Sequence, residues 1–258
     1  MRIYEIPIAH RGLHSKDVPE NSMQAFELAV EKGFNIETDV HLTKDGEVVC
    51  FHDFSLKRML GGIKGGISSV TLNDLKTDDK YKLPNGETIP TLQELLELVN
   101  GKVDILVELK SKSTFTYALE RNTYNEIKDL DWISVQAFNP ISVIWFHKNY
   151  PQIQRGVLDA GRMNFGSKLL QKIGGAFSMF EKHGCHFLAY NINQITDPQV
   201  SKNKELFNYK LLSWTVDTPE KMQKAKDNGV DNIIFEHLDI DVSSYKKLQP
   251  TNKDEKGE

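Results

Sequence analysis

The sequence has no long apolar run, although apolar residues make up 39% of its 258 residues. A transmembrane helix needs roughly 18 consecutive apolar residues, so no membrane-spanning segment is expected. The first residues contain no apolar stretch ahead of a small-residue cleavage site, which argues against a secretory signal peptide. We therefore expect a cytoplasmic protein without stable insertion into a membrane.

Cysteine is scarce, and an excess of basic charge is absent. Cys50 and Cys185 lie too far apart to form a C-x-x-C motif, so two core thiols in a reducing compartment are expected, with one disulfide as the alternative. Lys and Arg total 32 against 36 for Asp and Glu, a formal net charge of −4. Because nucleic acids are bound mainly by neutralising phosphates, we expect no nucleic-acid partner.

Three familiar catalytic motifs are also missing. The glycines of Gly61–Gly66 do not form the G-x-x-x-x-G-K-[ST] loop that cradles nucleotide phosphates, and no G-x-S-x-G nucleophile elbow occurs. The first strand ends in His10-Arg11-Gly12 and not in the H-x-H expected of a metal-dependent amidohydrolase barrel. These absences exclude a nucleotide-phosphate loop and a serine-hydrolase site as the basis of activity.

Short β-rich runs alternate with longer amphipathic runs along most of the chain. The predicted strands are Ile3–Ala9, Ile36–Val40, Val103–Leu109, Ile133–Ala137, Ile153–Leu158, His186–Tyr190, Lys210–Thr215 and Asn232–Phe235. The predicted helices are Ser22–Lys32, Leu92–Val99, Thr114–Leu130, Ile141–Asn149, Phe165–His183, Thr196–Leu206 and Glu220–Asn228. This alternation favours an α/β fold of the (β/α)8 TIM-barrel type, with a doubly wound parallel sheet as the alternative.

Local signals refine this organisation. Asn21 with Gln24 predicts a capping box at the first helix, and Thr91 predicts another cap ahead of Leu92. Residues 60–90 are rich in Gly, Lys and Asp and interrupt the alternation, which indicates a small insertion after the second strand. We expect one domain over residues 1–245 and a disordered tail over residues 246–258, where apolar periodicity ends.

Charged and polar residues gather where the predicted strands end. In a parallel barrel the carboxyl ends of all strands meet at one mouth, and catalytic groups come from several of them. The residues that this rule brings together are His10, Arg11, Glu37, Asp39, His52, Glu108 and Lys110.

Glu37 and Asp39 are two residues apart in a strand and therefore project from the same face. Two buried carboxylates repel each other, and a divalent cation would remove this conflict, with Glu108 as a third oxygen ligand. Oxygen ligands suit Mg²⁺ or Ca²⁺ better than zinc. The alternative is a buried ion network in which the carboxylates pair with Arg11 or Lys110.

His10 and His52 are candidates for a general acid and base, since imidazole titrates near neutral pH. Arg11 and Lys110 could neutralise an anionic substrate or only balance the carboxylates. The other histidines lack such neighbours in the sequence, and we expect most of them on the surface or in packing: His14, His41, His147, His183, His186 and His237.

The motifs taken together resemble the glycerophosphodiester phosphodiesterase family, and they keep its order from residue 9 to about residue 236. They are Ala9-His10-Arg11-Gly12, Pro19-Glu20-Asn21-Ser22 with Ala25-Phe26, Glu37-Thr38-Asp39-Val40, Leu42-Thr43-Lys44-Asp45-Gly46, Phe51-His52-Asp53, Ile89-Pro90-Thr91-Leu92, Glu108-Leu109-Lys110, Gln136-Ala137-Phe138-Asn139-Pro140, Trp214-Thr215-Val216-Asp217 and Gly229-Val230-Asp231-Asn232-Ile233-Ile234. The resemblance implies a TIM barrel with a small insertion after the second strand.

The resemblance also implies metal-dependent hydrolysis of glycerophosphodiesters, such as glycerophosphocholine and glycerophosphoethanolamine, to glycerol 3-phosphate and an alcohol. The residue roles that it implies are one Mg²⁺ or Ca²⁺ on Glu37, Asp39 and Glu108, acid/base catalysis by His10 and His52, phosphate contacts from Arg11 and Lys110, and a pocket wall with Trp214 and Gln136. The chain departs from the family pattern at Phe235-Glu236-His237, which leaves the pocket shape open there. The alternatives are a lysophospholipase D and a non-catalytic barrel that binds a phosphoester.

Overall fold

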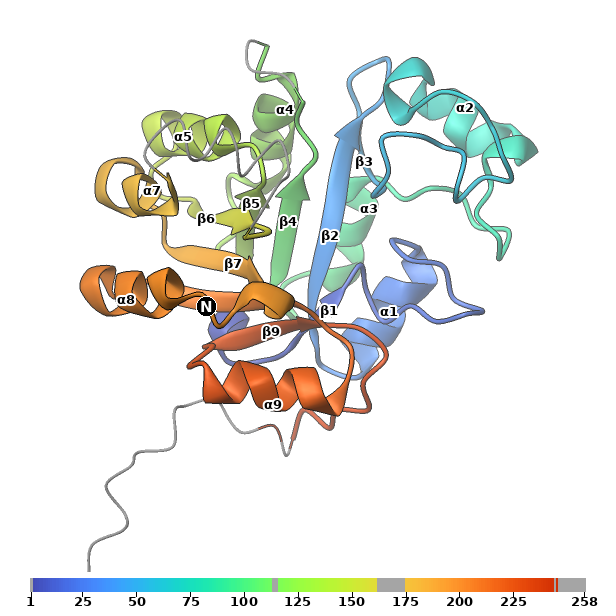
Figure 1. Ribbon diagram of the computed structural model, residues 1–258. Helices are drawn as coiled ribbons and strands as arrows, with labels where there is room; N and C mark the ends of the chain where they lie inside the picture. Colours follow the sequence, from blue (N-terminus) through green and yellow to red (C-terminus); the bar gives the residue numbers. More distant parts are fainter. Residues whose placement is uncertain (1, 113–115, 162–174, 244, 246–258) are drawn as a thin grey trace, which may run out of the picture.

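The computed structural model of the protein describes residues 2–112, 116–161, 175–243 and 245. Within them, nine strands form one sheet in the order β1-β9-β8-β7-β6-β5-β4-β2-β3, and β1 also pairs with β2. The β1–β2 pairing closes a ring of parallel strands that helices surround (Figure 1). The predicted (β/α)8 barrel is confirmed, and the doubly wound sheet is excluded.

The ring consists of the parallel strands β1 (Ile8–His10), β2 (Asn35–Leu42), β4 (Ile105–Leu109), β5 (Ile133–Ala137), β6 (Gln154–Asp159), β7 (Phe187–Asn191), β8 (Lys210–Val216) and β9 (Asn232–Phe235). The described α-helices are α1 (Met23–Glu31), α2 (Leu72–Thr77), α3 (Leu92–Val99), α4 (Ala118–Ile127), α5 (Pro140–Asn149), α7 (Gly175–His183), α8 (Pro198–Phe207) and α9 (Pro219–Asp227). The start of the predicted helix Phe165–His183 and the predicted tail at 246–258 lie outside the described residues.

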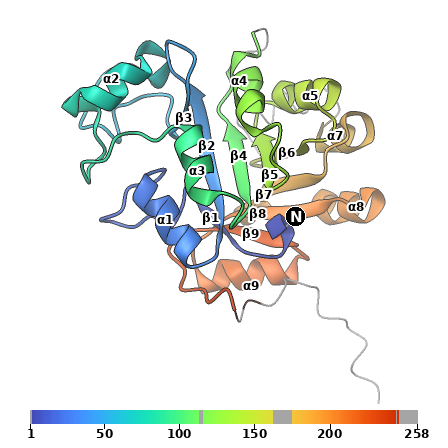
Figure 2. The same cartoon turned by 180° about the vertical axis from the view of Figure 1, so that it is seen from behind.

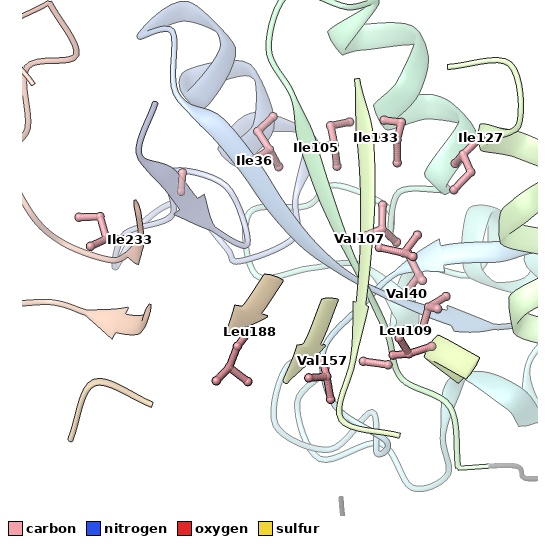
Figure 3. Close-up of a cluster of buried hydrophobic side chains, with 14 of the residues drawn as sticks. Ile36, Val40, Ile105, Val107, Leu109, Ile127, Ile133, Val157, Leu188 and Ile233 are labelled. Carbon is pink, nitrogen blue, oxygen red and sulfur yellow. The ribbon is translucent and has the colours of Figure 1, made fainter. Parts of the chain in front are cut away.

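Alternating side chains along each strand build two separate cores, because successive residues point to opposite faces. Outward residues such as Ile36, Val107 and Ile133 pack against the helices (Figure 3). Inward residues such as Leu106 and Leu212 fill the barrel axis. Gly156 also belongs to this inner face, where a Cβ atom would lie 2.1 Å from the ring of Phe187. The interior of the barrel is therefore a packed core and not an open channel.

The first predicted strand is too long. Residues Arg2–Tyr4 form a 3₁₀ turn, and β1 begins only at Ile8, after Pro7. Ile3 is fully buried with the inward residues of the barrel, and its backbone N–H donates to Asp104 Oδ2 at 3.0 Å. The apolar residues near the amino terminus are therefore explained by packing: Ile3 closes the end of the barrel opposite the pocket instead of extending β1.

The chain between β2 and α3 leaves the ring, as the predicted insertion requires. It contains the strand β3 (Val48–Cys50), antiparallel to β2, followed by α2 and by the 3₁₀ turns Ile67–Ser69 and Asp79–Tyr81. These elements stand beside the ring in both views (Figures 1 and 2) and have a small apolar core of their own. The insertion places the segment after β3 at the rim of the barrel mouth.

The first helix is capped one residue later than predicted. The Ser22 hydroxyl accepts the backbone N–H of Ala25 at 3.1 Å, so Ser22 is the N-cap. Asn21 instead has a φ of 53° and turns its side chain toward β2. The predicted cap at Thr91 is confirmed as a capping box with Glu94.

Both cysteines are free thiols, so the alternative of a disulfide is excluded. No helix in the described ranges combines the length and the apolar character that a membrane crossing requires.

Candidate active site

A pocket of about 430 Å³, partly open to solvent, lies at the carboxyl ends of the strands. Eight of the nine predicted site residues line it, and Asp39 is fully buried beside Lys110. The lining residues are His10, Arg11, Glu37, His52, Glu108, Lys110, Gln136, Phe138, Leu158, Trp214, Thr215 and Ile234. The structure thus brings together all residues that the sequence selects.

Three carboxylates from neighbouring strands form the floor of this pocket. Glu37 and Asp39 on β2 and Glu108 on β4 have side-chain oxygens within 4.8 Å of one another. Asp39 is the register partner of Glu108, which explains why the two meet. Their residues are only 1%, 0% and 5% exposed, so three carboxyl groups are held away from water. Such a cluster needs positive charge nearby.

Part of that charge comes from two basic side chains. Lys110 Nζ lies 2.9 Å from Asp39 Oδ1 and 2.5 Å from Glu108 Oε1. Arg11 Nε lies 3.2 Å from Asp39 Oδ2, and its backbone N–H donates to Glu37 Oε2 at 3.1 Å. Burial opposes ionisation of Asp39, but Lys110 and Arg11 hold its pKa well below the usual range.

Glu37 is the carboxylate that these cations satisfy least. Its Oε1 atom is buried and has no hydrogen-bond partner among the described residues. Burial, with repulsion from Asp39 and Glu108, raises the pKa of Glu37 well above its ordinary value. Burial likewise raises the pKa of Glu108. The ion network of the alternative interpretation is present but incomplete, and an all-oxygen set with an orphaned oxygen fits a hard divalent cation.

The turn after β1 brings Arg11 into place. Arg11 and Gly12 both adopt a left-handed backbone, with φ of 57° and 78°. A Cβ atom on residue 12 would lie 2.8 Å from the backbone of Ala25 in α1, so only glycine fits this close approach. The guanidinium then reaches Glu20, with Nη1 2.8 Å from Oε1.

Two histidines flank the carboxylates, and each holds a carboxylate of its own. His10 Nδ1 lies 2.5 Å from Glu236 Oε1, and His52 Nδ1 lies 2.6 Å from Asp53 Oδ1. Because an ionised carboxylate only accepts hydrogen bonds, Nδ1 of each ring carries the proton and Nε2 remains for other contacts. Burial lowers the pKa of both histidines, which favours neutral rings.

A series of ion pairs holds the His52–Asp53 pair in place. Arg58 donates to both Asp53 and Glu20, and its hydrogen bond helps to lower the pKa of Asp53 to about 2. Glu20 in turn accepts from Arg11. His52, the insertion and the turn after β1 are therefore tied together by one hydrogen-bonded network.

The opposite wall of the pocket is mostly apolar. Trp214 packs edge-on against Phe138 with ring centroids 5.5 Å apart, and its indole N–H donates to the Ala189 carbonyl at 3.1 Å. Leu158 and Ile234 complete this wall. Gln136, register partner of Glu108, has a buried Oε1 atom with no hydrogen-bond partner among the residues described. The pocket thus has a charged half and an apolar half.

Several residues that contact the site residues are not predicted from the sequence. Asn21 donates to Asp39 Oδ2 at 3.0 Å, although its spacing to Gln24 indicates a helix cap. His41, one of the six histidines expected mostly on the surface or in packing, donates from Nε2 to the His52 carbonyl at 3.1 Å. His14, from the same group of histidines, lies beside Glu236. Only the departure at Phe235-Glu236-His237 draws attention to Glu236 in the sequence.

Comparison with known proteins identifies the family of this chain. The model of the glycerophosphoryl diester phosphodiesterase family matches residues 10–240. The chain belongs to this family. It is therefore a phosphoric diester hydrolase with glycerophosphodiester phosphodiesterase activity.

Similar proteins from this phosphodiesterase family cover nearly the same length. A glycerophosphodiester phosphodiesterase of Caldanaerobacter subterraneus subsp. tengcongensis is 33% identical over 93% of this chain and 97% of its own. The structure of an Oleispira antarctica phosphodiesterase, in complex with the product sn-glycerol 3-phosphate, is 28% identical, with a TM-score of 0.73, and covers 90% of this chain and 93% of that one. The Thermotoga maritima enzyme is 25% identical, with a TM-score of 0.71, over 90% and 94% of the two chains.

Proposed function

We propose that this phosphodiesterase hydrolyses small glycerophosphodiesters, such as glycerophosphocholine and glycerophosphoethanolamine, to glycerol 3-phosphate and an alcohol. The observation that carries the proposal is the pair of carboxylate-bound histidines, His10 and His52, on one pocket with the three-carboxylate cluster. The product bound to the Oleispira antarctica relative supports the same product class.

Glu37, Asp39 and Glu108 would hold one divalent cation, Mg²⁺ or Ca²⁺. When bound, such a cation acts as a Lewis acid that neutralises charge on the phosphate oxygens. The orphaned Oε1 of Glu37 and the raised pKa of Glu37 both support a cation as the missing partner. The choice of ion is part of the proposal, and it follows from the hard oxygen ligands.

Acid/base catalysis would use the two free Nε2 atoms. One histidine accepts the proton of the nucleophile and the other donates a proton to the departing alkoxide. The nucleophile is water, or the glycerol 2-hydroxyl of the substrate, which gives a cyclic phosphate that water then opens to glycerol 3-phosphate. Arg11 and Lys110 contact the phosphate and stabilise the charge that develops on its oxygens. The neutral ring that burial favours can accept a proton on Nε2 directly, whereas the histidine that acts as the acid must first take up a proton from solvent on its Nε2.

The two halves of the pocket suggest how the substrate is oriented. The glycerol carbons would contact Trp214 and Phe138, with Gln136 as a polar contact in the same pocket. The alcohol part would then extend past Lys110 into a neighbouring groove of about 610 Å³. That groove carries Lys112, whose Nζ lies 3.7 Å above the Phe54 ring centroid. The positive charge there would slow the cationic choline and ethanolamine esters relative to polyol or anionic ones, without removing them from the substrate class.

The alternative lysophospholipase D activity has one observation in its favour. Phe54, in the lining of the groove, is 46% exposed, and half-buried Leu42 lines the same groove. An acyl chain could rest on this surface. Lysophospholipids therefore belong in the same assay as the water-soluble esters.

The experiment is a measurement of glycerol 3-phosphate release from glycerophosphocholine and glycerophosphoethanolamine with Mg²⁺, with Ca²⁺ and after EDTA. We expect release that depends on the cation and is lost in His10→Ala, while His147→Ala, far from the pocket, behaves as the original protein. Release only from lysophospholipids would favour the lysophospholipase D. No release from any ester would leave a barrel that binds a phosphoester without catalysis.

We also propose a cytoplasmic location, which the two unpaired thiols support.

A further inference from the structure

A second cluster of metal-ligating side chains lies beside the pocket, on the far side of His10. It consists of His14, from the loop after β1, and of Glu236 and His237, which follow β9. The parallel pairing of β1 with β9 joins the two ends of the barrel and brings these segments together. None of the three takes part in the proposed carboxylate site.

The distances within this cluster suit a metal ion. His14 Nε2 lies 3.4 Å from Glu236 Oε1, and one ligand atom from each residue lies within 4.8 Å of the others. Two ligands at roughly 2.1 Å from a tetrahedral ion are about 3.4 Å apart. Small side-chain rotations would therefore complete the site without a change in the backbone.

An unsatisfied atom points into the same space. His14 Nε2 is buried and forms no hydrogen bond with good geometry to any described residue, although Glu236 is close. A buried imidazole nitrogen without a partner is uncommon and calls for an explanation such as an ion. The Glu236 carboxylate faces this nitrogen, with Oε1 3.4 Å from His14 Nε2, and it lies within the same set of possible ligand atoms.

His237 lies on the solvent-exposed side of this cluster. It is exposed, and its backbone has a φ of 54°, a left-handed conformation that a non-glycine residue seldom adopts. This conformation holds the His237 ring edge-on to the His14 ring, with centroids 5.0 Å apart at 78°. Because His237 faces solvent, an ion could enter from that direction and keep water in its remaining positions.

We propose that His14, Glu236 and His237 bind a transition-metal dication of the Zn²⁺ class, at a site separate from Glu37, Asp39 and Glu108. Two imidazole nitrogens with one carboxylate oxygen suit Zn²⁺ or Co²⁺, whereas Mg²⁺ and Ca²⁺ prefer oxygen. The two sites therefore differ in the ion that they select. Glu236 links them, because the oxygen that faces His14 also accepts the hydrogen bond of His10.

The test is a titration of the purified protein with Co²⁺ in excess Mg²⁺, read by the visible d–d absorption of cobalt bound to nitrogen and oxygen ligands. We expect one absorbing cobalt per chain, displaced by one equivalent of Zn²⁺. His237→Asn suits the test because the side chain is exposed and Asn tolerates a positive φ. It should weaken cobalt binding at least about tenfold, and folded His14→Asn should do the same.

Two controls separate this site from other binding. His183→Asn removes a histidine from a different pair, that of His147 and His183, and should leave the titration unchanged. Glu37→Gln weakens the carboxylate site and should leave the cobalt band in place. A protein with no cobalt band, or a band of equal affinity in His237→Asn, would overturn the proposal. The readout needs no substrate, so its failure is distinct from a failure of the proposed phosphodiesterase substrates.

Discussion

Asn21 Nδ2 donates to Asp39 Oδ2 at 3.0 Å, and Asn21 Oδ1 accepts the Thr38 hydroxyl at 2.8 Å. The amide therefore fixes the orientation of a carboxylate that is fully buried. Replacing Asn21 by Ala should remove the amide contact to Asp39 and leave this carboxylate oriented only by Arg11 and Lys110. We expect metal affinity to fall by roughly 10- to 100-fold, the usual effect of a lost outer partner.

Isothermal titration with Mg²⁺ measures this effect. Asn149→Ala is the control, since this exposed amide donates to the Trp145 carbonyl in its own helix and belongs to neither the pocket nor the carboxylate cluster. Equal Mg²⁺ affinity in Asn21→Ala and Asn149→Ala would show that Asn21 does not position a ligand.

The two histidines should be needed to a similar degree, because each presents one Nε2 atom to the pocket while Nδ1 is bound to a carboxylate. We expect His10→Ala and His52→Ala to lower kcat by roughly 10²-fold or more, the scale of general acid–base catalysis. Steady-state kinetics on glycerophosphocholine, with KM determined separately, is the measurement. A kcat close to the original in both variants would reject the assigned roles.

Much of this site is predictable from the sequence because its three carboxylates lie on strands. Glu37 and Asp39 share a face by the period of two, and the parallel ladder places Glu108 opposite Asp39. A regular register thus turns sequence spacing into spatial proximity. The strand boundaries near Pro7 were less accurate, since the packing of Ile3 at the end of the barrel is a tertiary effect that alternation does not reveal.

The rest of the site depends on contacts between distant segments. His10 and Glu236 are 226 residues apart and meet because β1 pairs with β9 at the barrel seam. Asn21 has the sequence signature of a helix cap, yet Ser22 caps the helix and Asn21 turns inward. Such choices depend on side-chain direction at a turn, which local propensity does not specify.

Metal binding should weaken in acid because it requires an ionised Glu37. The pKa of Glu37 is raised, mainly by burial, so the metal-free protein keeps a proton there above its ordinary titration range. As pH falls through the raised pKa, Mg²⁺ affinity should drop by up to about tenfold per pH unit.

The raised pKa of Glu37 also affects the stability of the metal-free protein, which should decrease as the pH rises. Between the ordinary and the raised pKa, the folded state binds more protons than the unfolded state, so stability falls as pH rises. Thermal unfolding in EDTA should therefore show this loss, and the gain in Tm on adding Mg²⁺ should grow as the pH rises through the raised pKa of Glu37. A gain that does not change with pH would contradict the assignment of Glu37 as a ligand.

Lys112 should influence which headgroup alcohol the enzyme prefers in its substrates. Its ammonium group lies over Phe54 in the groove proposed for the headgroup. Lys112→Glu reverses the charge, so hydrolysis of glycerophosphocholine should improve relative to glycerophosphoglycerol. The measurement is the ratio of kcat/KM for the two esters, with exposed Lys128→Glu as the control for total charge. An identical ratio in both variants would place the headgroup elsewhere.

Zinc should inhibit the enzyme through Glu236. An ion bound by His14, Glu236 and His237 draws on the oxygen that accepts the hydrogen bond of His10, so it should disturb the orientation of that ring. In excess Mg²⁺, we expect Zn²⁺ to lower the rate of glycerol 3-phosphate release in the original protein. His237→Asn, compared with its own zinc-free rate, should need at least about tenfold more Zn²⁺ for the same inhibition, whereas His183→Asn should not. If His237→Asn binds cobalt weakly but is inhibited by the same Zn²⁺ concentration, zinc acts at the carboxylates and the link through Glu236 is wrong.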